Sequence, residues 1–175
     1  PDTFFTHFRH RLAHVDALPQ LALLGIVSGI VTGLIAVAFR LAIEWPLEFF
    51  LPAQQSEGFE SLSLEARLLL PLAGTILLIL VMRRRTKAQR QCGVGHVIER
   101  YQQHQAHLPA SNAIVQFIAG TLAAVSGHSV GREGPAVHLG ATCSSLLGQK
   151  LGLPNNSLRI MVGCGVAAAI AASFN

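Results

Sequence analysis

The sequence predicts an all-α integral membrane protein that passes through the bilayer several times. Of its 175 residues, 51% are hydrophobic and only 13% are charged, whereas an average soluble domain carries roughly 25% charged residues. The chain also contains 16 glycines, and glycine is more frequent in membrane helices than in soluble ones. These observations argue against a water-soluble globule, and the apolar content excludes a disordered chain.

The first predicted membrane helix covers residues 17–39, which include no charged side chain. At a rise of ~1.5 Å per residue this run reaches about 35 Å, enough to cross a ~30 Å hydrocarbon core. Gly25, Gly29 and Gly33 lie on one face at a spacing of four residues. Such a ladder of small residues favours close packing against another helix.

The later apolar runs are shorter or more polar. Residues 68–81 precede a basic cluster, and residues 101–131 become apolar only from about Ala113. Residues 134–149 and 160–175 each fall short of the ~20 residues that a full crossing needs. Short, glycine-interrupted segments of this kind predict partial helices that meet inside the membrane, a pattern found in transporters.

The placement of charges predicts the orientation of the chain. Basic residues flank the runs at Arg9, Arg11, Arg83, Arg84, Arg85, Lys87 and Arg90. Residues 40–67 hold five glutamates against two arginines. The positive-inside rule then places the N-terminus and residues 83–90 in the cytoplasm and residues 40–67 outside. We expect a multi-pass protein of the cell (inner) membrane, with residues 1–16 as a cytoplasmic interfacial segment.

The basic cluster at residues 83–90 has a second reading, a patch that binds nucleic acid. Because the cluster directly follows an apolar run, a role in membrane topology is favoured. No nucleic-acid partner is therefore predicted.

Two charged residues, Arg132 and Glu133, stand alone between long uncharged runs. An ionisable group at membrane depth costs roughly 2.5–3.5 kcal/mol or more, so a functional role is the default interpretation. Gly131, Gly134 and Pro135 mark a tight break, and Pro135 suits the first turn of a new helix. The alternative is a loop ion pair between Arg132 and Glu133 at the surface.

Glu133 would lie at the N-terminus of that new helix. The positive end of the helix dipole favours its carboxylate and equally favours an anion that displaces it. A site that holds either of the two can act as a gate. Protonation of Glu133 would weaken its hold on the site and so link anion passage to protons.

The five residues Gly131–Pro135 (GREGP) resemble a motif of the CLC family of chloride channels and transporters. The glycine- and alanine-rich residues 163–175, which end in Ala172-Ser-Phe-Asn175, look like the family segment that ends in AAAFN. The resemblance implies a homodimer with one anion pathway per subunit, Glu133 as the external gating residue, and no cofactor. Chloride or a similar anion would pass through a channel or a proton-coupled antiporter.

The same resemblance implies that residues 17–175 are a transmembrane domain of the voltage-gated chloride channel type. They would form part of the first inverted repeat, without its end. The chain stops within an apolar segment, so we expect it to end inside a membrane helix and to be a piece of a longer protein. Membrane lipid would surround it.

In that family a GSGIP motif precedes GREGP and offers a serine hydroxyl to the anion. A count without gaps places Cys92 at the serine, Gly93 at a glycine and Gly95 at the proline. A thiol is a weaker donor than a hydroxyl, but the N–H groups of Gly93 and Val94 could still bind an anion at a helix start. By resemblance, these residues and Gly131, Arg132, Gly134 and Pro135 form the anion site. The alternative is that residues 91–96 are a plain cytoplasmic turn.

Other chemistry is less well supported. No Cys/His/Asp pattern with zinc spacing accompanies the eight histidines, so no metal site is predicted. His96 is a candidate for tuning anion binding, and His138 is expected to be packed and hydrogen-bonded. An intramembrane serine hydrolase using Ser126 or Ser129 with His128 lacks the Gly-x-Ser-x-Gly elbow. A purely structural membrane fragment is the remaining alternative, and no enzyme is predicted.

Overall fold

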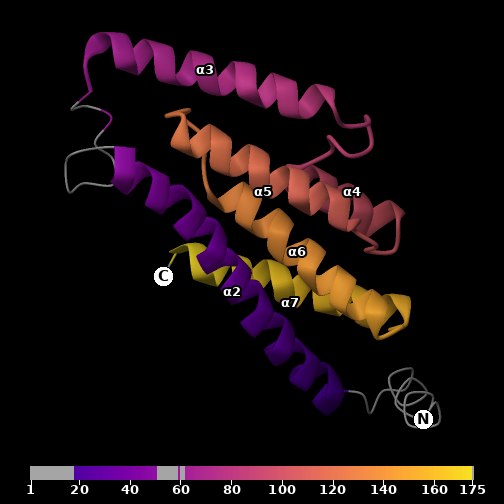
Figure 1. Cartoon of the computed structure of the whole chain (residues 1–175). Coiled ribbons are helices and arrows are strands. Elements are labelled where there is room, and N and C mark those ends of the chain that lie inside the picture. The colour runs from indigo at the N-terminus through magenta and orange to yellow at the C-terminus, as the bar shows by residue number, and fades with distance from the viewer. Residues whose placement is uncertain (1–17, 51–58, 60–61, 175) are drawn as a thin grey trace.

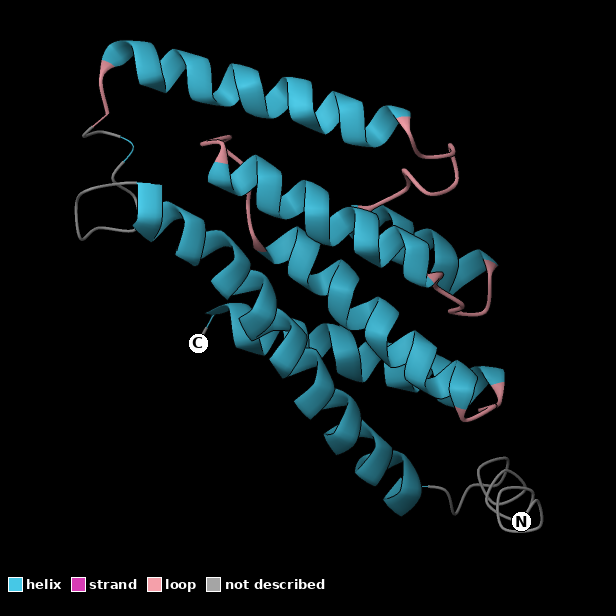
Figure 2. Cartoon of the chain, in the orientation of Figure 1, coloured by secondary structure: helices cyan, strands magenta, loops and turns pink. Residues whose placement is uncertain are grey.

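The computed structural model describes residues 18–50, 59 and 62–174. Within these residues it is helical and contains no strand, as the all-α prediction requires (Figures 1 and 2). The helices are α2 (Leu18–Phe50), α3 (Leu64–Arg83), α4 (Gly93–Gln103), α5 (Ala110–Val125), α6 (Glu133–Lys150) and α7 (Asn155–Phe174). The predicted interfacial segment, residues 1–16, lies outside the described residues.

Among the described helices, α2, α3 and α7 are long and apolar enough to cross a membrane, and α5 is apolar but shorter. α7 is longer than the apolar run 160–175 that predicts it. It begins at Asn155, directly after Pro154, whose carbonyl accepts a hydrogen bond from the Leu158 N–H at 2.9 Å. The prediction used apolar residues alone, so it missed the polar first turn of α7.

α2 also continues beyond its predicted end. The sequence predicts that the first membrane helix ends before Arg40, its first charged residue. Residues 40–67 are then predicted to form a loop on the outer side. The helix instead reaches Phe50, because Ile43 and Leu47 keep the helical period and are buried. Arg40 and Glu44 pair within one turn of this extension, so the charges end the apolar run without ending the helix.

α6 forms the centre of the described fold, and more than half of its residues are buried. Figure 1 shows it between α2 and the pair α4 and α5, with α7 behind. It packs against α2, α4, α5 and α7. Ser144 on α6 shares a buried hydrogen bond with Ser28 on α2. This packing fixes the position of α6, whose first turn is the predicted site.

The crossing of α6 and α7 depends on two glycines. A Cβ atom on Gly140 would lie 2.6 Å from the backbone oxygen of Gly165, and one on Gly165 would lie 2.5 Å from the oxygen of Gly140. Such separations are below any real contact between these atoms. The two backbones therefore approach as closely as they do because neither position carries a side chain.

The predicted glycine ladder on α2 is used in part. A Cβ atom on Gly25 would lie 3.4 Å from Cys164 Sγ, and one on Gly29 would lie 4.0 Å from Ala168 Cβ, so both positions face α7. A Cβ atom on Gly33 meets nothing within 4 Å. Two of the three glycines thus serve helix packing, and the Cys164 side chain packs against one of them.

We expect Gly140→Ala to lower the free energy of unfolding by about 1–3 kcal/mol, because the added methyl group has no space. Gly33→Ala is the matched control, because a Cβ atom at this position meets no other atom within 4 Å. It should leave the free energy of unfolding unchanged or raise it by up to ~1 kcal/mol. Thermal unfolding in detergent measures both. Equal losses in the two variants would contradict the close crossing.

Candidate functional site

The predicted break at residues 131–135 is a helix start. Glu133 is the first residue of α6, and Arg132 is its N-cap residue. The side chain of Arg132 makes no capping hydrogen bond. Pro135 lies in the first turn, where its missing N–H removes no helical bond. The N-terminal end of α6, with its uncapped backbone N–H groups, is therefore open to a negatively charged group.

The Glu133 side chain folds back over Gly131. A Cβ atom on Gly131 would lie 2.6 Å from Glu133 Oε2. Only a glycine at position 131 leaves room for the carboxylate there. Glu133 is otherwise exposed, so its side chain is free to leave this position without disturbing the packing of α6.

Glu133 lines a cleft of about 540 Å³ between three parts of the chain. The lining residues are Ala36, Phe39 and Arg40 from α2, residues 130–133 with Ala136 at the start of α6, and Ala172 and Ser173 near the end of α7. Half of these ten residues are alanine, glycine or serine, and the charged ones are two arginines and one glutamate. The cleft is thus open to a small anion and has cationic groups in its lining.

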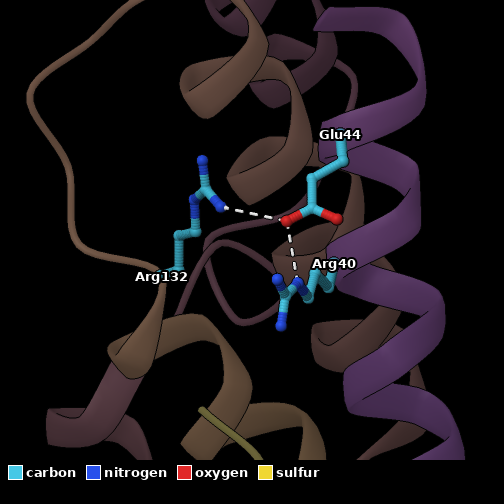
Figure 3. A network of polar contacts seen from close by, with 3 residues as sticks. All are labelled: Arg40, Glu44 and Arg132. Carbon is cyan, nitrogen blue, oxygen red and sulfur yellow. Dashed lines mark hydrogen bonds and ion pairs between the residues drawn. The ribbon is translucent and has the colours of Figure 1, made fainter. Parts of the chain in front are cut away.

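Arg132 lies near a carboxylate other than that of Glu133. Its Nη1 atom is 3.8 Å from Oε1 of Glu44 on α2. The same oxygen accepts a hydrogen bond from Arg40 Nε at 2.7 Å, as Figure 3 shows. In the part of the chain that the structure describes, no ion pair joins Arg132 to Glu133. The alternative reading of a loop ion pair between these neighbours is therefore wrong.

Cys92 lies before α4 and is its N-cap residue, without a capping hydrogen bond from its side chain. The thiol instead donates to the Asn112 carbonyl oxygen, with Sγ 3.7 Å away. Burial raises the pKa of the Cys92 thiol above its ordinary value, which favours the neutral thiol. Residues 93–96 are helical, not a plain turn, and Gly93 has φ +80°, a conformation that glycine adopts readily.

Cys92, Gly93 and Val94 do not line the cleft that contains Glu133. The structure therefore brings Gly131, Arg132 and Glu133 together at one cleft and leaves the start of α4 outside it. Gly134 and Pro135 belong to the first turn of α6 but are not among the lining residues.

Two buried histidines connect α4, which begins after Cys92, with α6, which begins at the cleft. His96 Nδ1 on α4 and His138 Nε2 on α6 lie 2.9 Å apart and share a hydrogen bond. His138 is fully buried, as expected from its apolar surroundings, and its Nδ1 atom has no hydrogen-bond partner. His96 thus contacts α6 one turn beyond Glu133 and does not reach the cleft.

Asn112 is a neighbour of Cys92 that sequence reasoning missed. It is buried, and its Nδ2 atom donates to the backbone oxygens of Ala88 at 2.7 Å and Gln91 at 2.8 Å. These bonds hold the turn that leads to Cys92. The available signal was the amide side chain of Asn112 in the first turn of the apolar helix α5. A buried polar group needs hydrogen-bond partners, so this amide predicts contacts with a neighbouring segment.

The described residues bring together neither a cluster of metal ligands nor a serine with a histidine base. Among the described residues no three His, Cys, Asp or Glu side chains gather as metal ligands. The His128 ring bonds to Thr75 Oγ1 at 2.9 Å and to the Ala123 oxygen at 3.2 Å. No described hydrogen bond joins it to Ser126 or Ser129, so the two atoms of a nucleophile–base pair are not brought together.

Comparisons with known proteins point to the same family as the motif at residues 131–135. The family described as voltage gated chloride channel matches residues 73–175. A ClcB-like protein of Ralstonia nicotianae is 33% identical over 164 residues, covering 89% of this chain and 38% of the relative. The voltage-gated ClC-type chloride channels ClcB of Yersinia pseudotuberculosis and Yersinia pestis are each 27% identical over 155 residues. The match covers 87% of this chain and 37% of each relative.

The chain therefore spans a little over a third of the length of these curated relatives. No solved structure matches it significantly.

We expect His138→Ala to lower the free energy of unfolding by about 2–4 kcal/mol, because it leaves a cavity and an unpartnered His96 nitrogen in the core. His107→Ala, at an exposed position, should stay within ~0.5 kcal/mol of the parent. Denaturant unfolding in detergent measures both. A His138→Ala protein as stable as His107→Ala would show that the pair does not hold α4 on α6.

Proposed function

Because the chain belongs to the voltage-gated chloride channel family, we propose that it carries part of the pathway by which the whole protein moves chloride across a membrane. Glu133 is the gate of this pathway. The observation that carries the proposal is the position of Glu133, as the first residue of α6, in the lining of an open cleft.

The mechanism follows from competition between two negative groups. The positive end of a helix dipole favours a nearby anion by ~0.3–1 kcal/mol at an exposed position, and more where water is excluded. The Glu133 carboxylate and a chloride ion compete for this end of α6. Chloride gains access when the carboxylate rotates away or takes up a proton, and the exposure of the Glu133 side chain leaves it free to do so.

The start of α4 offers a second set of anion ligands, outside the cleft. The Cys92 thiol is engaged with the Asn112 carbonyl, so the backbone N–H groups of Gly93 and Val94 are the donors we assign there. The anion would thus meet main-chain donors at this position, where the family resemblance expects a serine hydroxyl.

Arrangement in the membrane is part of the same proposal. The protein is a homodimer in the cell membrane, with the N-terminus in the cytoplasm and the cleft on the outer side. Support for the outer position comes from charge placement, because α2 carries Arg40 and Glu44 in the acidic segment assigned to the outside. Channel and proton-coupled antiporter both fit a glutamate gate, and proton movement distinguishes them.

We expect Glu133→Ala in the whole protein, reconstituted in liposomes, to keep chloride flux but to lose most of its dependence on external pH. The variant lacks the group whose protonation opens the pathway. Coupled proton movement, if the parent shows it, should also disappear. Chloride efflux and intravesicular pH, recorded over a range of external pH, measure the two effects.

Glu65→Gln is the control, because Glu65 lies in the first turn of α3, is exposed and does not line the cleft. It should behave as the parent. A Glu133→Ala protein with the parent's pH response would refute the gate.

A further inference from the structure

A group of charges at the cleft, three of whose members line it, extends beyond residues 131–135. Arg40 and Glu44 come from α2, and Arg132 comes from the N-cap of α6 (Figure 3). One oxygen, Glu44 Oε1, lies 2.7 Å from Arg40 Nε and 3.8 Å from Arg132 Nη1. The Glu44 side chain is 21% exposed, whereas those of Arg40 and Arg132 are 62% and 43% exposed. The carboxylate is thus the sheltered member, and the two cations face the cleft.

Helix stability does not explain this group. Within α2, the basic residue precedes the acidic one at a spacing of four, which is the weaker order for such a pair. Exposed ion pairs contribute only about 0–1 kcal/mol in any case. The contact of Arg132 with Glu44 crosses from one element to another, and it brings two guanidinium groups to one place.

The charges near the cleft cancel only while the gate is charged. Arg40, Arg132 and Glu133 line it, and Glu44 touches both arginines without lining it. With both carboxylates ionised, two positive and two negative charges sum to zero. When Glu133 is protonated, one positive charge is uncompensated, so an anion is attracted at the moment the pathway opens.

We propose that Arg40 and Arg132 form an access site for the anion, and that Glu44 holds the two arginines there and sets their net charge. This inference rests on the proposed function, since it assumes that an anion passes Glu133. The ligand is a small monovalent anion such as chloride. Arg40 is the residue newly assigned to recognition, and Glu44 is a positioning residue.

Electrostatic attraction of this kind acts on the rate at which an anion arrives. A unit charge ~6 Å from the anion contributes somewhat under 1 kcal/mol in water and more where low-dielectric walls focus the field. Salt screens the effect, since the Debye length falls from ~30 Å at 0.01 M to ~3 Å at 1 M. A role in recruitment therefore differs from a role in packing through its dependence on ionic strength.

The test measures the chloride concentration that gives half-maximal flux through the whole protein in liposomes, at low and at high ionic strength. Arg40→Gln should raise this concentration about three- to tenfold at low ionic strength, and Arg40→Lys, which keeps the charge, should restore it. Glu44→Gln keeps an oxygen that can accept from Arg40 but removes the negative charge, so it should lower the concentration. All differences should shrink at high ionic strength.

Glu48→Gln is the matched control, because Glu48 lies one turn further along α2, is exposed and does not line the cleft. It should leave the half-maximal concentration unchanged. Parent behaviour in Arg40→Gln would overturn the access site, as would an equal effect of Glu48→Gln and Glu44→Gln, or failure of Arg40→Lys to restore the parent value.

The two proposals fail separately. The gate is measured by the pH dependence of flux in Glu133→Ala, and the access site by the ionic-strength dependence of the half-maximal concentration in Arg40→Gln. A pH response that survives in Glu133→Ala would refute the gate alone. A whole protein that moved no anion would overturn both.

Discussion

The close approach of α6 and α7 is the constraint on which the rest of the described structure depends. Gly140 and Gly165 let two backbones meet where any side chain would collide. In a lipid environment, helices gain little from hiding apolar surface, so close packing and hydrogen bonds between helices must hold them together. This crossing places the start of α6 and the end of α7 around the same cleft, and small residues of α2 pack onto the α7 side of it.

Hydrogen bonds between buried polar side chains then orient α6 relative to α2 and α4. The Ser28–Ser144 bond joins α2 to α6, and the His96–His138 bond joins α4 to α6. Both are buried, where a missing partner would cost about 1–3 kcal/mol. They hold α6 over its length, so that its first turn is positioned by a rigid helix although Glu133 itself is exposed. A gate needs this combination of a fixed helix end and a side chain free to move.

Much of the site could be predicted from local sequence. Glycines on both sides of Arg132 and Glu133, followed by Pro135, predict a break and a new helix, and α6 begins at Glu133. The two charges were recognised because ionisable residues are rare in apolar runs. The role of Glu133 as a gate stays a prediction. The extension of α2 was missed because a charged residue was read as the end of a helix, whereas Arg40 and Glu44 pair within it.

By itself, the sequence determined the all-helical membrane character, most of the apolar helices and the break before Glu133, because each depends on neighbouring residues along the chain. Only the tertiary structure decided which groups meet Arg132 and His138. Their partners, Glu44 and His96, are distant in sequence, and no local periodicity relates such positions. The physical reason is that helix formation follows short-range hydrogen bonds, whereas the cleft arises from how closely particular helix faces can approach one another.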